Sequence, residues 1–199
     1  MSSSKKRDDS ATEDFLARLE SNPEYVAGRA RLNEELQRQH SEWRRAEAPL
    51  RAELQAAGLD VASVWDLVNT VAPYPDALPI LLKHLRRPYP DRVREGIARA
   101  LAVRDAKFGW DELTALYIAE PEGTNAKRGL AVALAAVSHK AVLDDVIALA
   151  HDRRHGTSRL HFLRALRRSR DPRARQAFED LESDPQLQSE VRRLLKRRK

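Results

Sequence analysis

The chain has no cysteine, little glycine and few aromatic residues. Its 199 residues include 7 glycines, and aromatic residues make up 6%. The absence of cysteine excludes disulfides, thiolate metal sites and a cysteine nucleophile. Scarce glycine and aromatic residues argue against a sandwich or barrel built from strands and tight turns. These absences favour a helical protein.

Long apolar runs are also missing. No run approaches the roughly 20 residues that a membrane span requires. The first nine residues are polar and carry no apolar stretch of the kind found in secretory signals, so we expect them to form a disordered tail. We therefore predict a cytoplasmic protein with no membrane association.

Familiar catalytic and cofactor motifs are absent as well. The sequence holds no nucleophile elbow, phosphate-binding glycine loop or dinucleotide fingerprint. His151 and His155 have the spacing of a metal pair on a helix. However, Gly156 marks a helix end, and no Cys or Glu stands at ligand spacing. We predict no metal, no cofactor and no enzymatic activity.

Positive charge is concentrated near the C-terminus. The net charge is +6, yet residues 151–199 hold 15 Lys and Arg against 7 Asp and Glu, while residues 1–150 hold 21 against 23. Such asymmetry favours an anionic partner, either nucleic acid or an acidic protein surface. The alternative is a solvated helical surface with a basic tail.

Residues 24–57 carry a narrow hydrophobic stripe. Leu36, Trp43 and Leu50 are seven residues apart, as in a coiled-coil seam. Pro49 interrupts the helix because it lacks a backbone donor. We predict one long helix or two, kinked near Pro49, outside any repeat. The stripe would mediate a dimer or hold a partner helix.

An internal repeat follows. Four blocks of eight residues, spaced 29 to 33 residues apart, align at 94–101, 127–134, 159–166 and 188–195. Their fourth, seventh and eighth positions follow the i, i+3, i+4 spacing of a helix buried on one face. The sequence predicts two-helix units at roughly 76–103, 110–137, 140–168 and 172–198, with Leu101, Leu134 and Leu166 buried.

The segment ALPILLKHLRRPYPDRVREGIARAL, residues 77–101, resembles a HEAT repeat, including the variant found in phycobilisome-lyase-like proteins. Leu78-Pro79 matches the first-helix pattern and Pro90-Asp91 the turn, and the resemblance extends over about residues 60–199. It implies an all-α fold, an α-solenoid of about four HEAT-like helical hairpins with the second helices lining a concave face. The predicted parts are a tail at 1–9, a helical segment at 10–57 and a HEAT-like domain at 58–199.

A column of cations recurs in the repeats. The first block position holds Arg94, Lys127 and Arg159, the sixth adds Arg99 and Arg164, and Arg167 follows in the third unit. Side chains that flank a buried stripe can reach the groove, where cations would bind an anionic partner. The alternative is that the first-position cations pair between neighbouring units with Asp91 and Asp111.

HEAT arrays are mostly binding scaffolds, so the resemblance implies little chemistry. We predict a non-catalytic adaptor that holds a protein partner, whose surface could be acidic. The second interpretation is a nucleic-acid-binding module. The third is an enzyme of glycosylase or lyase type.

Overall fold

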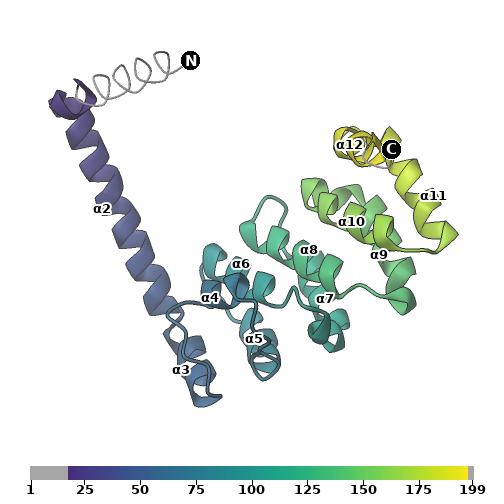
Figure 1. Ribbon diagram of the computed structural model, residues 1–199, viewed down its shortest axis with the longest axis horizontal. Helices are drawn as coiled ribbons and strands as arrows, with labels where there is room; N and C mark the ends of the chain where they lie inside the picture. The colour runs from purple at the N-terminus through teal and green to yellow at the C-terminus, as the bar shows by residue number, and fades with distance from the viewer. Residues whose placement is uncertain (1–17, 197–199) are drawn as a thin grey trace, which may run out of the picture. The chain divides into compact units, whose positions relative to one another are not determined.

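The computed structural model describes residues 18–196, and within this range the chain is helical and contains no strand (Figure 1). The chain divides into two compact units, residues 1–45 and 46–199. No helix of the described part is long and apolar enough to cross a membrane. The predicted tail at 1–9 lies outside the described residues.

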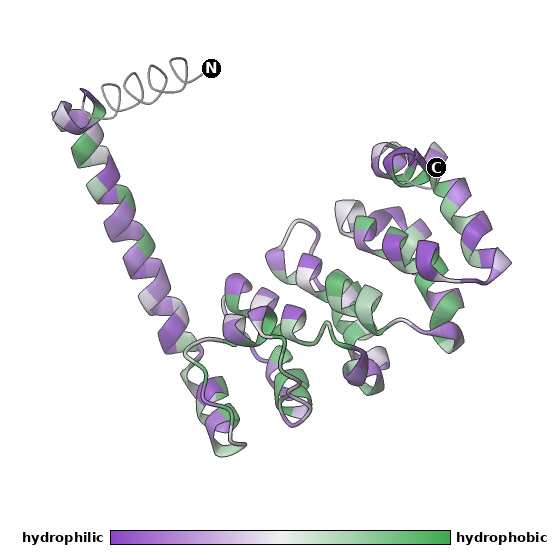
Figure 2. Ribbon diagram, in the orientation of Figure 1, coloured by the Kyte–Doolittle hydropathy of each residue, from purple (hydrophilic) through white to green (hydrophobic). Residues whose placement is uncertain are grey.

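The first unit contributes one long helix, α2 (Pro23–Ala46). It begins where the side chain of Asn22 accepts hydrogen bonds from the backbone N–H groups of Glu24 at 2.9 Å and Tyr25 at 3.3 Å. Hydrophilic residues dominate this helix (Figure 2), and none of its residues is buried. Leu36 is 43% exposed. A dimer through this region stays a prediction.

The helix ends next to Pro49, and a second one, α3 (Ala48–Ala56), follows directly. Of the predicted alternatives, one long helix or two, the structure shows two helices with the break near Pro49. Leu50 and Leu54 of α3 are completely buried. They pack toward α5 (Ala77–Leu85), so α3 belongs to the second unit and the boundary falls before Ala46 rather than after residue 57. The predicted stripe thus divides, because Leu50 serves the core of the second unit.

Apart from α4, which precedes the first predicted unit, the remaining helices form pairs that match the predicted ranges. Their bounds are α4 Val64–Asn69, α6 Asp91–Ala100, α7 Trp110–Ala119, α8 Asn125–Val137, α9 Leu143–His151, α10 Leu160–Arg168, α11 Pro172–Asp180 and α12 Gln188–Lys196. Short 3-10 segments, including η1 (Arg104–Gly109) and η3 (Arg153–Arg159), join some of them.

The second helices pack in series. α4 lies against α6, α6 against α8, and α8 against α10, while α5, α7 and α9 each pack on the second helix of their own pair (Figure 1). A glycine permits the close approach of α6 and α8. A Cβ on Gly129 would lie 2.9 Å from the carbonyl oxygen of Glu95, which is too close for any side chain.

The predicted core columns are buried. Leu101 and Leu134 are 0% exposed and Leu166 is 1% exposed, which confirms the prediction for these leucines.

The same repeat spacing aligns Leu85, Ile118 and Ala150 of the first helices, and Leu85 and Ala150 are buried, but α7 differs by one residue. In α7, Tyr117 is fully buried whereas Ile118, which aligns with Leu85 in the sequence, is 54% exposed. The α7 register therefore places an aromatic residue with a polar hydroxyl in the core.

Candidate functional site

The cations at the first block position turn inward. Lys127 is 2% exposed and Arg159 is 0% exposed, and the Arg94 side chain is 20% exposed. The prediction that Lys127 and Arg159 line a partner-binding groove is wrong, because their charged ends are surrounded by protein acceptors. Lys127 and Arg159 each bind carbonyl groups at the end of the helix that precedes them in their own helix pair, where the last carbonyls lack partners within the helix.

Arg159 connects two neighbouring helix pairs, α9/α10 and α11/α12. Its guanidinium donates to the Ala150 carbonyl at the end of α9 at 3.1 Å and to the Gly156 carbonyl at 2.9 Å. It also donates to the Asp184 carboxylate at 2.9 Å and to the Gln186 side-chain oxygen at 2.7 Å, both in the next unit. Asp184 is itself buried, and its bond to Arg159 lowers the pKa of the carboxyl.

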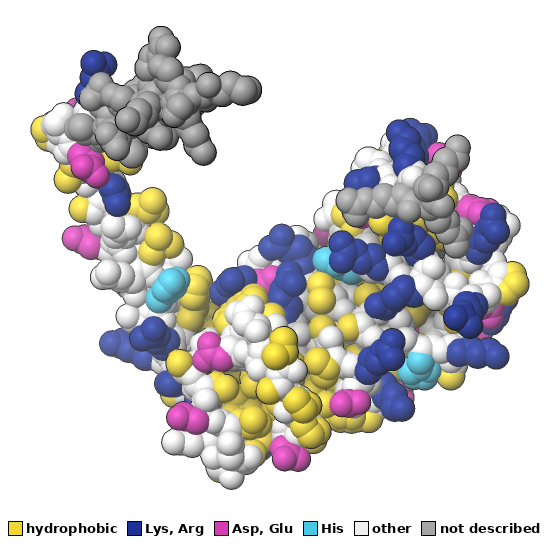
Figure 3. All heavy atoms as spheres, in the orientation of Figure 1, with side chains coloured by type: hydrophobic (Ala, Val, Ile, Leu, Met, Phe, Trp, Pro, Cys, Tyr) yellow, Lys and Arg dark blue, Asp and Glu magenta, His cyan; other side chains and the backbone are white. Residues whose placement is uncertain are grey.

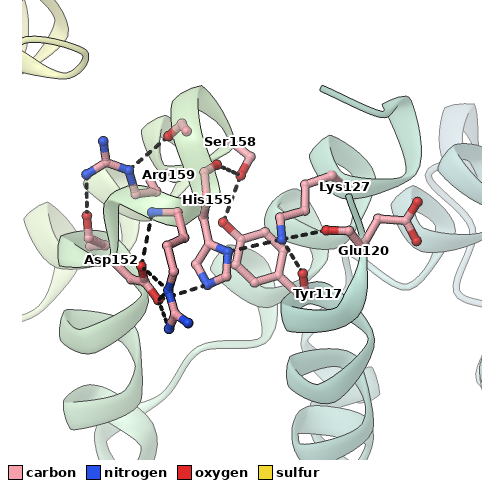
Figure 4. A network of polar contacts seen from close by, with 10 residues as sticks. Tyr117, Glu120, Lys127, Asp152, His155, Ser158 and Arg159 are labelled. Carbon is pink, nitrogen blue, oxygen red and sulfur yellow. Dashed lines mark hydrogen bonds and ion pairs between the residues drawn. The ribbon is translucent and has the colours of Figure 1, made fainter. Parts of the chain in front are cut away.

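Lys127 occupies the equivalent position one unit earlier (Figure 4). Its Nζ donates to the carbonyl oxygens of Tyr117 and, at 2.9 Å, Glu120. The same Nζ lies 3.1 Å from Nδ1 of His155, which belongs to the next unit. Burial lowers the pKa of this lysine, although the carboxylate of Glu120 opposes the shift.

Arg94 repeats the link in the preceding unit, where it pairs with Glu120 at 2.6 Å. The interpretation that these cations pair between units is therefore right in kind, but Asp91 and Asp111 are not the partners. The Asp91 carboxylate instead accepts from the backbone N–H groups of Asn125 at 2.9 Å and Ala126 at 2.8 Å, and so caps α8. Asp111 is exposed.

The buried polar network around Lys127 also contains a serine and a histidine (Figure 4). The Ser158 hydroxyl donates to the backbone carbonyl of His155 at 2.6 Å and lies 2.7 Å from the Tyr117 hydroxyl. A nucleophilic serine would instead bond the histidine ring nitrogen. Burial raises the pKa of Tyr117 to about 12, so the phenol stays protonated. These contacts join neighbouring units rather than activate a nucleophile.

The two histidines at metal-pair spacing do not form a site. His155 is 4% exposed and lies in the network, whereas His151 is exposed. Among residues 18–196 there is no group of three or more His, Cys, Asp or Glu placed to hold a metal ion.

The network predicts sensitivity to acid. Burial, followed by the charge of Lys127, lowers the pKa of His155 below its ordinary 6.5. The unfolded chain therefore binds this proton at a higher pH than the folded chain. The free energy of unfolding should fall as pH falls from about 7.5 to about 5.5. Chemical denaturation at several pH values measures this slope.

Burial also lowers the pKa values of His84 and His161, so His155→Gln should reduce the slope without abolishing it. His151→Gln, at an exposed position, serves as the control and should leave the slope unchanged. An unaltered slope in His155→Gln would exclude His155 as a source of the acid sensitivity.

Other cations lie on the outside of the second helices. We define the second-helix surface as Arg99 on α6, Arg128 on α8, and His161 and Arg164 on α10. Burial lowers the pKa of His161, and the positive charges of Arg99, Arg164 and Arg128 lower it further, which places all three near the imidazole. Lys and Arg side chains gather over this part of the second unit (Figure 3).

The arginines of this surface differ in their partners. Arg99 bonds the buried Glu95 at 2.8 Å, and Arg128 bonds the side chain of Asn125. Arg164 makes no hydrogen bond or ion pair with any residue between 18 and 196. Its charge is therefore not neutralised by a direct partner in that range.

Of the six predicted site residues, Arg99 and Arg164 share this surface. Arg167 donates to the Leu194 carbonyl at 3.3 Å and so links α10 to α12. Arg128 and His161 were not among the residues predicted from the sequence. Arg128 holds the second position of its repeat block and His161 the third. These positions lie four and three residues before the sixth, so on a helix they share its face, and this spacing was the available signal.

A mainly apolar cavity of about 380 Å³ adjoins the surface, and Arg99 and Val132 line part of it. The other lining residues include Leu67, Val68, Val71, Tyr74, Leu78, Ala102, Val103 and Asp105. Arg92 of α6 lies over the ring of Trp65 of α4, with its guanidinium carbon 3.8 Å from the ring centroid. Apolar and cationic groups thus lie side by side.

Comparisons with known proteins found no similar protein. No family model matches the chain, and neither the curated proteins nor the solved structures contain a significant match.

Proposed function

We propose that this protein is a non-catalytic binding scaffold, a short HEAT-like α-solenoid that holds an acidic segment of a protein partner. The observation that carries the proposal is the second-helix surface, where the charges of Arg99, Arg128 and Arg164 act on His161 and where Arg99, with Val132, also lines the apolar cavity. The serial packing of α4, α6, α8 and α10 supports a repeat scaffold, since each pair packs chiefly on its neighbours.

The mixture of groups favours a protein over a nucleic acid. Arginine beside apolar side chains is typical of protein interfaces, whereas interfaces with nucleic acid are more polar and more uniformly cationic. Val132 takes the sixth block position between Arg99 and Arg164, where a phosphate-binding ladder would carry a third cation. We therefore expect acidic side chains on the partner to bind the arginines and an apolar side chain to enter the cavity.

Nucleic acid is the second candidate. The carboxylate of Glu95, on α6 beside Arg99, is 3% exposed and bound by Arg92 and Arg99. Because its negative charge is buried and paired with these two arginines, Glu95 should repel an approaching phosphate only weakly. Binding to phosphates would release counterions and depend steeply on salt.

The double variant Arg128→Glu/Arg164→Glu tests the proposal. It reverses two exposed charges that hold no core contact, so the fold should persist. Affinity for a labelled acidic peptide containing leucine and phenylalanine should fall about tenfold or more, because attraction becomes repulsion. Fluorescence anisotropy measures this affinity, and a 20-base-pair DNA duplex and a single-stranded RNA are titrated in parallel at two salt concentrations.

Lys107→Glu/Lys196→Glu is the matched control, since both lysines are exposed and the charge change is the same. It should retain peptide affinity. If the protein binds the duplex or the RNA in a salt-dependent way, and only the Arg128→Glu/Arg164→Glu variant loses this binding, the partner is nucleic acid and not a protein. Equal affinities in both variants would exclude the second-helix surface as the binding site.

A further inference from the structure

We propose that a separate cavity in the second unit binds an organic diphosphate, a small molecule with two linked phosphoryl groups on an apolar or aromatic body. The cavity has a volume of about 590 Å³ and lies where α8 and α10 end and α9 and α11 begin. This volume is within the range of pockets that hold small organic ligands.

Unpaired cations converge on this cavity. Arg104, Lys140 and Arg170 line it and are exposed. None of the three makes a hydrogen bond or ion pair with residues 18–196. Elsewhere in the unit most arginines hold a carboxylate or a carbonyl, as the pair of Arg86 with Glu112 illustrates. Three cations at one place without such partners leave their donors available to a ligand.

The charge of the lining selects a multiply charged anion. Arg168 also lines the cavity, and Asp171 is the single carboxylate there, so the four Lys and Arg side chains and one Asp give a net charge of +3. Asp171 is bound by Arg173 at 3.1 Å, which lowers the pKa of its carboxyl, and the charge of Lys140 lowers that pKa further. A monocarboxylate would leave most of this charge unmatched, whereas two phosphoryl groups neutralise it. Guanidinium groups match phosphoryl oxygens through paired hydrogen bonds.

Nearby helix ends do not oppose an anion strongly. The Ala135 carbonyl, near the end of α8, accepts hydrogen bonds from Arg168 at 2.6 Å and from the Ser138 hydroxyl at 2.9 Å. These bonds offset the partial negative charge that an uncapped helix C-terminus would present. Arg168 is thus engaged by the fold, and the three unpaired cations are the ligand-binding groups.

The cavity also has apolar walls. Leu143, Val146 and Ala165 form its buried base, and Ala136 and Pro172 line it with more exposed apolar surface. A phosphate ion alone would leave this apolar lining uncovered. An organic body attached to the phosphoryl groups would cover it and gain affinity from burial.

Isothermal titration calorimetry on the full chain without divalent cations tests the proposal, with adenosine diphosphate as the probe. Adenosine supplies the ring without the charge, and pyrophosphate supplies the charge without the ring. We expect adenosine diphosphate to bind, pyrophosphate to bind more weakly and adenosine not to bind. Equal affinities for pyrophosphate and adenosine diphosphate would overturn the role of the apolar walls, and failure of both to bind would overturn the site.

The variant Lys140→Gln/Arg170→Gln should lower the affinity for adenosine diphosphate by about tenfold or more, because two charge-assisted contacts are lost. Lys107→Gln/Lys196→Gln is the matched control, since it also removes two charges, both lysines are exposed, and neither lines the cavity. A similar loss in both variants would reduce the binding to general electrostatic attraction and refute the site.

The second-helix surface does not contribute lining residues to this cavity. Arg128→Glu/Arg164→Glu should therefore still bind adenosine diphosphate more tightly than Lys140→Gln/Arg170→Gln does. Loss of peptide binding with retention of adenosine diphosphate binding supports both sites separately. Retained peptide binding in Arg128→Glu/Arg164→Glu refutes only the proposed function.

Discussion

Arg159→Ala is expected to lower the free energy of unfolding by about 3–5 kcal/mol, as when one partner of a buried ion pair is removed. The guanidinium is completely buried, and its loss leaves the Asp184 carboxylate, 7% exposed, with only the longer 3.4 Å ion pair to the exposed Arg153 among the described residues. The carbonyls of Ala150 and Gly156 lose a donor as well. Urea denaturation followed by circular dichroism measures the change.

A surface pair provides the control. Arg175 and Glu179 form an ion pair at 2.8 Å with side chains 69% and 41% exposed, so Arg175→Ala should cost about 1 kcal/mol or less. The double variant Arg159→Met/Asp184→Leu should recover much of the stability lost in Arg159→Ala, because no buried charge then remains unpaired. If Arg159→Ala were as stable as Arg175→Ala, the assignment of Arg159 to the interior would be wrong.

Leu134→Ala should cost about 2–5 kcal/mol, the range for truncating a core leucine. Leu134 is 0% exposed and lies in α8, which packs between α6 and α10. The space left by the missing atoms is enclosed from several directions, so neighbouring helices relax into it only partly. A lower thermal midpoint and a lower urea midpoint are the expected results.

Ile118→Ala serves as the comparison and also tests the α7 register. The sequence alignment places Ile118 in the core column, but it is 54% exposed, so its truncation should change stability by about 0.5 kcal/mol or less. If Ile118→Ala lowered the free energy of unfolding as much as Leu134→Ala does, Ile118 would be the core residue of α7, as the sequence alignment has it, and the burial of Tyr117 would be contradicted.

Much of the helical architecture could be predicted because its signals are local. The spacing of Leu101, Leu134 and Leu166 reflects a helix buried on one face, and their burial follows. Proline and capping residues mark helix ends within a few positions of the residues they affect, as Pro49 does between α2 and α3. The repeat alignment also placed Arg94, Lys127 and Arg159 at equivalent positions. The structure gives all three the same role, a contact with the next helix pair.

The direction of those cations could not be predicted from the sequence. A residue beside a buried stripe can turn toward solvent or toward the core, and the outcome depends on acceptors at the end of the preceding helix and on acceptors from the next helix pair. Arg159 finds Asp184 twenty-five positions away, and Lys127 finds His155 twenty-eight positions away. No local spacing shows that these groups meet.

The sequence by itself determined the helical class, the repeated pairs and the positions of the core leucines, because side-chain periodicity and capping act over one or two turns. Tertiary structure alone decided which cations are buried, that Arg128 and His161 share a surface with Arg99 and Arg164, and that Arg104, Lys140 and Arg170 line one cavity. The physical reason is that burial and charge pairing depend on distance in space, and the packing of successive helices brings distant segments together.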